Sequence, residues 1–183
     1  MTENKETQQK EMMEETVLEV SDIDYKFRSE ISEFPGAEKV MLCFQCGTCT
    51  ADCPIARFSD FYRPRKLIRM TQLGLKDKLF SDDVMWLCST CFTCVDHCPQ
   101  DVGIASIVRA LRNLSVKERG IPEVFKGLAS NILKTGYAYI IPELRLKKRK
   151  EQGLPTLPKA NLESVARLFD TTDLPKMLEK ERI

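Results

Sequence analysis

The sequence contains only one histidine and one tryptophan, and it has no run of about 18 to 20 apolar residues that would span a membrane. Residues 1–15 are polar and charged and lack the apolar core of a signal peptide. An excess of one charge is missing as well, because 28 Lys plus Arg offset 27 Asp plus Glu. A net charge of +1 provides no long-range field that would attract nucleic acid. We therefore expect a cytoplasmic protein that binds neither a membrane nor nucleic acid.

Motifs that would indicate catalysis are also missing. The sequence has no G-x-G-x-x-G, no phosphate-binding loop and no nucleophile elbow, and its single histidine, His97, has no spare cysteine to activate. Alternation of apolar and polar residues, which is typical of a half-buried strand, is not convincing anywhere. These absences predict an all-α chain without a substrate site, so that another subunit would carry out the chemistry.

The eight cysteines are the most informative residues that are present. Structural disulfides are disfavoured in the reducing cytoplasm, so we expect these thiols to bind metal. They occur in two copies of the pattern C-x2-C-x2-C-x3-C-P, and each cysteine of the second copy follows its counterpart by 45 positions. The copies read CFQCGTCTADCP over residues 43–54 and CSTCFTCVDHCP over residues 88–99. The chain therefore carries an internal repeat of a metal-binding loop.

Thiolates are soft ligands, and three of them at every third residue can converge from a tight loop on a cubane iron-sulfur cluster. One corner of the cube is left for a more distant cysteine. In two-cluster ferredoxins this ligand is the last cysteine of the other motif. Transferred to this sequence, the rule predicts two [4Fe-4S] clusters. The first would be bound by Cys43, Cys46, Cys49 and Cys98, and the second by Cys88, Cys91, Cys94 and Cys53.

Other interpretations of the motif residues are weaker. Structural zinc sites use pairs of cysteines and fit two triplets, each followed by Cys-Pro, poorly. We expect His97 to be a surface or packing residue rather than a ligand or proton shuttle. The aromatic residues Phe44, Trp86 and Phe92 are expected to shield the clusters from water rather than to conduct electrons. Gly47 suits a backbone that comes close to an inorganic sulfide or has a positive φ angle.

Two basic segments have alternative interpretations. The first comprises Arg57, Arg63, Arg65, Lys66 and Arg69. It is either a solvated helix face, which is the simpler explanation, or a docking surface for an acidic partner or a phosphate-bearing cofactor. The second segment, from Arg145 to Lys150, lacks interleaved aromatic residues, which disfavours RNA binding.

Helical periodicity and end signals predict short helices around the cysteine motifs. The expected helices run from Ser21 to Phe34, Pro64 to Gly74, Ser81 to Cys88, Asp101 to Gly120 and Pro122 to Gly136. The expected domains are a mobile tail at residues 1–16, a dicluster domain at residues 17–140, and a basic, partner-packing tail at residues 141–183. The predicted fold is all-α, with two cluster-binding loops between short helices.

Three segments together resemble the C subunit of heterodisulfide reductase from methanogenic archaea. They are the first cysteine motif, the spacer sequence RPRKLIR with Leu73-Gly74, and the sequence MWLCSTCFTCVDHCP at the second motif. The resemblance covers about residues 20–140. The cysteine pattern alone is shared with iron-sulfur subunits of succinate, glycolate and glycerol-3-phosphate oxidising enzymes, whereas the spacer and the Trp-Leu-Cys entry are more particular.

This resemblance implies an alpha-helical ferredoxin-like domain that serves as a non-catalytic electron relay in an oxidoreductase complex. Electrons would pass from a flavin and iron-sulfur subunit to the subunit that reduces the mixed disulfide of coenzyme M and coenzyme B in methanogenesis. A hydrogenase or a formate dehydrogenase would be a further partner. The Cys-Cys-Gly motifs of the disulfide-reducing subunit are absent here, so that reaction would occur in the partner. The alternatives are a relay for glycolate, succinate or glycerol-3-phosphate oxidation, and a redox-sensing or nucleic-acid-binding protein with structural clusters.

Overall fold

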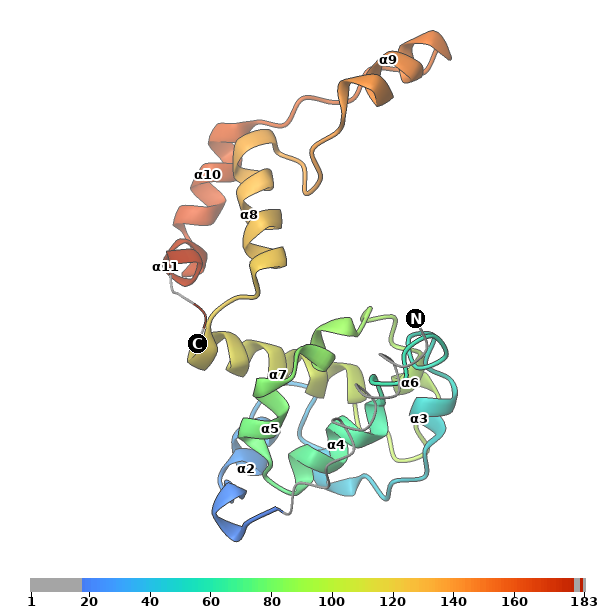
Figure 1. Ribbon diagram of the computed structural model, residues 1–183, viewed down its shortest axis with the longest axis vertical. Coiled ribbons are helices and arrows are strands. Elements are labelled where there is room, and N and C mark those ends of the chain that lie inside the picture. The colour runs from blue at the N-terminus through green and yellow to red at the C-terminus, as the bar shows by residue number, and fades with distance from the viewer. Residues whose placement is uncertain (1–17, 180–181, 183) are drawn as a thin grey trace, which may run out of the picture. The chain divides into compact units, whose positions relative to one another are not determined.

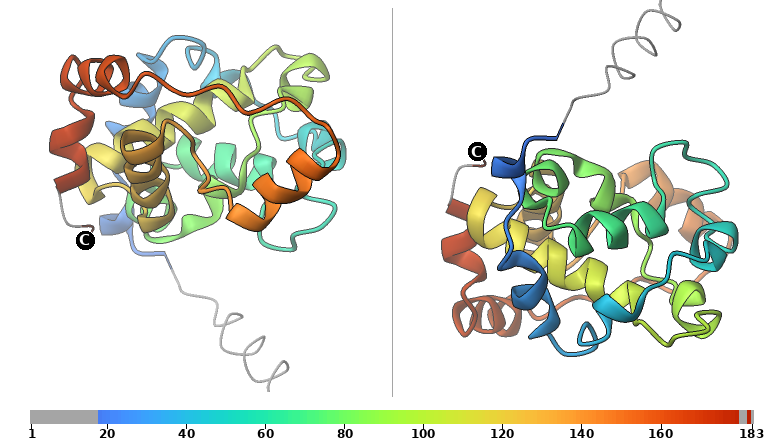
Figure 2. Two further views of the ribbon diagram at one scale, coloured as in Figure 1. Left: turned by 90° about the horizontal axis from the view of Figure 1, so that it is seen from above. Right: turned by 90° about the horizontal axis from the view of Figure 1, so that it is seen from below.

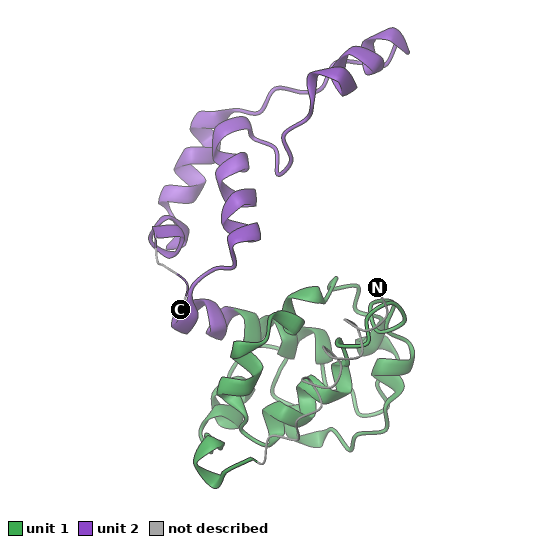
Figure 3. Ribbon diagram, in the orientation of Figure 1, with its two compact units in different colours: residues 1–112 green, residues 113–183 purple. Residues whose placement is uncertain are grey.

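The computed structural model of the chain describes residues 18–179 and 182, and the predicted mobile tail at residues 1–16 lies outside them. Within this part of the chain every regular element is a helix, which confirms the predicted all-α fold. None of the described helices is long and apolar enough to cross a membrane. The chain forms two compact units, residues 1–112 and residues 113–183, as Figure 3 shows. The predicted domain boundary after residue 140 stays a prediction.

Unit 1 consists of short helices around the two cysteine motifs (Figure 1), and Figure 2 shows them from two further directions. In chain order they are η1 (Val20–Asp22), α2 (Phe27–Ser32), η2 (Val40–Leu42), α3 (Thr48–Ala51), α4 (Pro64–Gln72), α5 (Lys76–Ser81), η3 (Asp83–Leu87), α6 (Thr93–Asp96) and the first part of α7 (Ile104–Arg119), where η denotes a 3-10 helix. Unit 2 begins within α7 and contains α8 (Glu123–Thr135), α9 (Glu143–Glu151), α10 (Leu162–Asp170) and α11 (Leu174–Glu179).

Apolar side chains of α2, α4, α5 and α7 form the core of unit 1. Helix α2 packs against α4, and α4 packs against α5. Phe27 of α2 meets Phe80 of α5 edge to face, with ring centroids 5.7 Å apart, which is a favoured geometry for aromatic pairs. Ile68 of α4 and Leu111 of α7 are fully buried. This core fixes the helices that flank the cysteine loops.

Several residues that were predicted to delimit helices do so. Pro64 is the first residue of α4. At this position a backbone N–H would have no partner within the helix, so its absence costs no hydrogen bond, and the fixed φ of proline suits the helix. Gly74 follows α4 with φ +76°, Gly120 follows α7 with φ +86°, and Gly136 follows α8 with φ +75°. Glycine is favoured at this position because the left-handed conformation that ends a helix strains other residues. Gly74 also lies against the carbonyl oxygen of Asp24, where a Cβ atom would not fit.

The predicted helix from Ser21 to Phe34 is wrong in its first part. Only the short η1 forms there, and the α-helix begins at Phe27. The side chain of Asp24 accepts hydrogen bonds from the backbone N–H groups of Lys26 at 2.9 Å and of Phe27 at 3.3 Å. A side chain that binds its own backbone in this way competes with the helix, which therefore starts late.

The predicted helix that starts at Ser81 is displaced as well. Helix α5 ends at Ser81, and the 3-10 helix η3 follows it. Asp82 caps η3 by accepting a hydrogen bond from the backbone N–H of Val84 at 3.1 Å. Asp101, which was predicted to cap α7, lies three residues before that helix and forms an ion pair with Lys39 at 2.6 Å instead.

In unit 2, helix α10 packs against α8 and α11. Asn161 caps α10 by accepting a hydrogen bond from the backbone N–H of Ser164 at 3.1 Å. Helix α9 carries the basic segment from Arg145 to Lys150. On α8, Val124 and Phe125 remain 74% and 37% exposed. Unit 2 contains no cysteine, so the predicted metal sites belong to unit 1 alone.

Candidate metal-cluster site

Each cysteine motif forms a loop that leads into a one-turn helix. Helix α3 follows Cys46, helix α6 follows Cys91, and the two short helices pack against each other (Figure 1). The two repeats therefore meet in space although a long spacer separates them in the sequence. All eight cysteines lie in the described part of the chain and are free thiols.

The two loops share an uncommon backbone conformation. Gln45 and Gly47 have φ angles of +66° and +91°, and the equivalent residues Thr90 and Phe92 have φ angles of +55° and +63°. These left-handed residues flank the second cysteine of each motif and bend the chain tightly on both sides of it, so that thiols three residues apart can face one centre. A positive φ was one of the two roles expected for Gly47. The other three positions were missed because no glycine marks them.

One thiol of the first motif lies with three thiols of the second. A small hollow in unit 1 is lined by Cys53 together with Cys88, Cys91 and Cys94. These are the four residues that the sequence predicts as ligands of the second cluster. Further lining residues, among them Ile55, Tyr62, Pro64, Phe92 and Ala105, are mostly apolar. Phe92, which was expected to shield a cluster from water, is one of these residues and is itself 40% exposed.

The remaining three cysteines lie near Cys49. Burial raises the pKa of Cys49, the hydroxyl group of Thr50 partly offsets this, and the nearby thiols of Cys43, Cys46 and Cys98 raise the pKa further. The residues that act on Cys49 are thus the three other residues of the predicted first ligand set. The structure thus places Cys53 beside the first three cysteines of the second motif and Cys98 near Cys49, while the assignment of the eight thiols to two clusters stays a prediction.

The surroundings of Cys94, the third cysteine of the second motif, strongly raise its pKa. Burial raises the pKa of Cys94 to about 12, and four nearby thiols, those of Cys88, Cys49, Cys91 and Cys53, act in the same direction. A thiol with such a pKa stays protonated at neutral pH unless a cation stabilises the thiolate. Iron ions bound among the thiols would supply that stabilisation.

The pKa of the second cysteine of each motif is shifted in the opposite direction. Cys46 and Cys91 are exposed. Thr48 and Thr93, the first residues of α3 and α6, place a hydroxyl oxygen 3.5 Å from the respective sulfur atoms. Hydrogen bonding to these threonines lowers the pKa of both thiols. Each motif therefore combines a readily ionised thiol at the surface with less exposed thiols behind it.

Hydrogen bonds reach the first cysteine of each motif from different groups. Gln45 donates from Nε2 to Cys43 Sγ at 3.4 Å. Cys88 accepts a hydrogen bond from the backbone N–H of Thr90 at 3.4 Å, and the phenol of Tyr62, a residue only 2% exposed, also bonds to it. Burial, followed by this contact, raises the pKa of Tyr62. Sequence reasoning missed Tyr62 because it lies in the spacer, outside the motif.

Polar side chains from the flanking helices hold both loops in the same way. Gln72 of α4 donates from Nε2 to the carbonyl oxygens of Val40 at 3.1 Å and Cys43 at 2.9 Å. Arg112 of α7 donates to the carbonyl oxygens of Met85 at 2.9 Å and Cys88 at 2.6 Å. In each case a buried or half-buried side chain fixes the carbonyl of the first cysteine. The guanidinium of Arg112 also lies 5.3 Å from the ring centroid of Trp86.

The two loops are joined directly by one pair of side chains. His97 Nδ1 lies 2.7 Å from Asp52 Oδ2. The two residues are 45 positions apart and occupy equivalent places in the repeat, each just before the last cysteine. His97 is 55% exposed, in agreement with the expected surface position, but its partner was not foreseen.

The donor set fits an iron-sulfur cluster better than a single ion. Among the residues that the structure describes, no three Cys, His, Asp or Glu side chains are close enough to share one metal ion. Each thiolate around a cubane binds a different iron, so its ligands stand further apart than those of one zinc ion. The groups assembled here contain only thiols, lie beside apolar residues and accept hydrogen bonds at sulfur. These are the surroundings in which [4Fe-4S] clusters are held.

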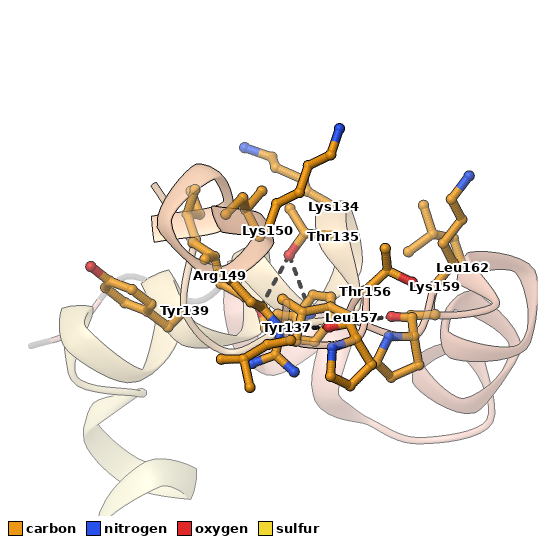
Figure 4. A pocket seen from close by; sticks show the side chains of 17 residues that line it. Lys134, Thr135, Tyr137, Tyr139, Arg149, Lys150, Thr156, Leu157, Lys159 and Leu162 are labelled. Atoms are coloured by element: carbon orange, nitrogen blue, oxygen red, sulfur yellow. Dashed lines mark hydrogen bonds between the residues drawn. The ribbon is translucent and has the colours of Figure 1, made fainter. Parts of the chain in front are cut away.

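Unit 2 contains a separate cavity of about 730 Å³ (Figure 4). Its lining is mainly apolar and comes from the end of α8, the turn at residues 137–141, helix α9, the segment at residues 154–160 and the start of α10. The phenol of Tyr137 donates to the Pro158 carbonyl, and Arg149 Nε donates to the Pro155 carbonyl at 2.7 Å. These polar groups hold the segment in place. The cavity therefore offers apolar surface rather than metal ligands.

Helical architecture, a repeated thiol loop and eight cysteines in two motifs define a ferredoxin-type protein that binds 4Fe-4S clusters. In agreement, a family model described as "4Fe-4S dicluster domain" matches residues 39–102, the segment that contains all eight cysteines.

Curated relatives narrow the assignment further. The chain is 34% identical to the C subunit of "H(2):CoB-CoM heterodisulfide,ferredoxin reductase" from Methanothermobacter thermautotrophicus, over 90% of this chain and 91% of the relative. It is 35% identical to the iron-sulfur C subunit of "CoB--CoM heterodisulfide reductase" from Methanopyrus kandleri, over 90% and 92%. It is 37% identical to the C2 subunit of "H(2)/formate:CoB-CoM heterodisulfide,ferredoxin reductase" from Methanococcus maripaludis, over 75% and 78%.

The chain belongs to the family of heterodisulfide reductase C subunits, as the resemblance predicted. Family and domain together assign it an iron-sulfur electron-transfer role as a subunit of an oxidoreductase.

Proposed function

We propose that the chain binds two [4Fe-4S] clusters through crossed sets of cysteines. Cys43, Cys46, Cys49 and Cys98 would hold the first cluster, and Cys88, Cys91, Cys94 and Cys53 the second. The observation that carries this proposal is the hollow that Cys53 lines together with the first three cysteines of the other motif. The position of Cys98 among the neighbours of Cys49 supports the reciprocal set.

When bound, clusters of this type exchange single electrons without forming bonds to a substrate. The chain's own residues would set the conditions for this exchange. Gln45 and Tyr62 hydrogen-bond to cysteine sulfur, which favours the reduced and more negative state. Gln72 and Arg112 hold the loops through backbone carbonyls, so that the sulfur positions need not rearrange when an electron arrives.

The proposed task is to relay electrons within a cytoplasmic heterodisulfide reductase complex. Electrons would enter from a flavin and iron-sulfur subunit and leave to the subunit that reduces the CoM-S-S-CoB disulfide, with a hydrogenase or formate dehydrogenase as an associated partner. The names of the relatives include this disulfide, and some include hydrogen or formate. The chain itself would be non-catalytic, because its sequence offers no motif that binds and transforms a substrate.

Residues 17–140 would form the dicluster domain, and residues 141–183 would contact a partner protein. The cavity of unit 2 leaves much apolar surface in water, since Tyr139 is 67%, Ile140 58% and Leu154 47% exposed. Its lining includes cationic residues and no carboxylate: Lys134, Arg149, Lys150 and Lys159. A partner segment with apolar side chains and flanking carboxylates would complement this surface.

Double variants test the crossed ligand sets. Anaerobically purified protein should contain about eight iron and eight sulfide ions per chain. Cys53→Ala combined with Cys91→Ala should retain about four iron ions, because both changes remove the same cluster. Cys53→Ala combined with Cys46→Ala should retain almost none. If iron analysis and electron paramagnetic resonance gave the reverse order, each motif would bind its own cluster and the crossed assignment would be wrong.

Co-purification tests the proposed partners. A tagged chain isolated from its source should bring with it a flavoprotein and a subunit with Cys-Cys-Gly motifs, and the complex should reduce CoM-S-S-CoB. The C53A/C91A variant should keep the subunits together but lose electron flow between them. Recovery of a membrane anchor or of a glycolate, succinate or glycerol-3-phosphate dehydrogenase would favour the alternative relay.

A further inference from the structure

Beside the first cysteine loop lies a hollow of about 380 Å³. Gln45 and Thr50 of the loop line one side of it, and cations at the start of α4 line the other, namely Arg63, Arg65, Lys66 and Arg69. No carboxylate contributes to its lining. The chain is nearly neutral as a whole, with a net charge of +1, so this concentration of positive charge is local.

The fold of α4 explains why these cations face solvent. The helix is strongly amphipathic, because Leu67, Ile68, Thr71 and Gln72 are buried on one face. Arg65, Lys66 and Arg69 are left exposed on the other. Within the described residues no carboxylate forms an ion pair with these three side chains, whereas neighbouring cations such as Lys76 do have acidic partners. Their charge is therefore available to a second molecule.

Arg63 differs from the other three cations. Its guanidinium donates to the backbone carbonyls of Ala56 at 3.1 Å, Ser59 at 2.5 Å and Tyr62 at 3.1 Å, and it pairs with Asp60 at 3.5 Å. It thus holds the segment before α4 in place. Of the five basic residues singled out in the sequence, Arg63 is thus structural, Arg65, Lys66 and Arg69 face outward beside the hollow, and Arg57 does not line it.

Two residues that line the hollow contact thiols of the first ligand set. Gln45 lines it and donates to Cys43 Sγ at 3.4 Å. Thr50 lines it as well, and its hydroxyl is 4.0 Å from Cys49 Sγ. The backbone N–H of Arg65 donates to the same hydroxyl at 3.0 Å, which ties α4 to the loop. A group bound in the hollow would be separated from these sulfur atoms by a single side chain.

The surroundings favour a protein surface over a small anion. Small-molecule sites orient their ligand with a few well-placed polar groups and enclose most of it. In the described chain every buried side-chain nitrogen or oxygen already has a hydrogen-bond partner, so none is left to orient a small ligand here. Exposed arginines and lysines instead suit carboxylates on an opposing surface, because such charges steer association and fix its orientation.

We propose that Arg65, Lys66 and Arg69 form the docking surface for an acidic face of a redox protein, which exchanges electrons through the first cluster. This inference rests on the proposed relay function and names the entry point for one partner. The hollow around the second ligand set is lined by no charged side chain apart from its cysteines. The docking surface therefore assigns the acidic partner to the first cluster rather than the second.

Rapid mixing of the reconstituted, oxidised protein with a reduced acidic plant-type ferredoxin tests the proposal. The same ferredoxin with amidated carboxylates serves as the matched probe. At low ionic strength the variant R65Q/K66Q/R69Q should be reduced at least about tenfold more slowly than the wild type, since electrostatic steering contributes about 10 to 1,000-fold to association rates. The wild-type rate should fall as salt rises, while the variant rate should change little. Amidated ferredoxin should remove the difference between the two proteins.

The control variant R145Q/K147Q/K148Q removes three cations from α9 that do not line the cavity of unit 2, and it should behave like the wild type. Fluorescence anisotropy with labelled ferredoxin measures binding without electron transfer and should show the same order of affinities. Equal rates and affinities for wild type and R65Q/K66Q/R69Q would overturn the docking surface, as would an equal loss in the α9 control. If neither protein contained iron that dithionite reduces, the relay function itself would fail.

Discussion

The two cysteine loops of unit 1 are alike in backbone and different in surroundings. Both turn through left-handed residues on either side of the second cysteine, both lead into a one-turn helix, and a threonine stands beside the exposed thiol in each. The two copies of the repeat thus share the backbone geometry that directs the thiols of each loop toward one centre. Since ligand type and loop shape are shared, any difference in function between the loops must come from the side chains around them.

Those side chains differ in three ways. The left-handed position before the one-turn helix is Gly47 in the first loop and Phe92 in the second. The first cysteine accepts a hydrogen bond from Gln45 in one loop and from the buried phenol of Tyr62 in the other. Cations line the hollow beside the first loop, while mostly apolar residues line the hollow of the second. Such differences predict unequal reduction potentials and different partners for the two proposed clusters.

The largest expected effect comes from replacing Gly47 by a β-branched residue. Gly47 has φ +91°, and a left-handed L-residue costs about 1–2 kcal/mol, with more for valine. Gly47→Val should therefore lower stability by about 2 kcal/mol, or roughly 4 to 8 °C in melting temperature. Because the strain falls within the first loop, the iron bound there should be lost first. Thermal unfolding and iron analysis of the purified variant measure both effects.

The matched change in the other loop is Phe92→Gly. It removes a left-handed strain of about 1 kcal/mol but also removes a ring that is only 40% exposed, so the two effects should nearly cancel. A melting temperature within about 4 °C of the wild type is expected. Equal damage from both substitutions would show that the left-handed position does not distinguish the loops.

A smaller effect is expected in the reactivity of the thiols in cluster-free protein. Cys46 and Cys91 are exposed, and hydrogen bonds from threonine lower the pKa of both thiols. Cys49 is buried, and burial raises its pKa, so less thiolate is present at neutral pH. Iodoacetamide at about pH 7.5 should modify Cys46 and Cys91 at least about tenfold faster than Cys49 and Cys94. Peptide mass spectrometry of timed samples gives the order, and uniform labelling would contradict it.

The hydrogen bonds to the first cysteines should tune the two clusters separately. Gln45→Leu removes the donor to Cys43, and Tyr62→Phe removes the phenol that bonds to Cys88 while keeping the buried ring. Loss of one hydrogen bond of about 1 kcal/mol should make the potential of one cluster more negative by roughly 40 mV. Redox titration followed by electron paramagnetic resonance measures each cluster. If the same electron paramagnetic resonance signal shifted in both variants, Cys43 and Cys88 would bind the same cluster.

The sequence predicted those parts of the molecule that depend on local chemistry. Pro64 marks the start of α4 because its constraint is a property of one residue. Gly74 and Gly136 mark helix ends because only glycine adopts their backbone freely. The fold class and the family were predicted correctly for the same reason, since the cysteine spacing and the adjoining residues are local signals. The ligand pairing remains a prediction until the double variants are measured.

Parts that depend on distant contacts could not be predicted in this way. Gln72 and Arg112 reach the loops from helices that lie 29 and 24 residues from the cysteines whose carbonyls they bind. Neither belongs to a motif, and a polar residue on a helix is more often solvated. Phe92 adopts a left-handed backbone that its residue type disfavours, so the surrounding structure must impose it. The helix predicted from Ser21 does not form before Phe27, because the side chain of Asp24 accepts hydrogen bonds from the backbone there. The apolar periodicity of the sequence does not reveal this contact.

The smallest expected effect concerns Asp52 and His97, the pair that joins the two loops. Exchanging these residues tests directly whether the two loops are equivalent at this contact. Asp52 and His97 occupy equivalent places in the repeat and lie 2.7 Å apart. Asp52→His or His97→Asp alone places two like residues opposite each other and should lower stability by about 0.5 kcal/mol, as for other exposed pairs.

The double exchange D52H/H97D should restore most of that loss, because it places the same two side chains across the same gap. Chemical denaturation of the four proteins at one salt concentration gives the interaction energy as a double-mutant cycle. Additive losses would show that the two positions are equivalent in sequence but not in space. Restoration would show that the two loops are interchangeable at this contact. The difference between the loops would then lie in Gly47, Gln45, Tyr62 and the cations of α4 rather than in their shared backbone geometry.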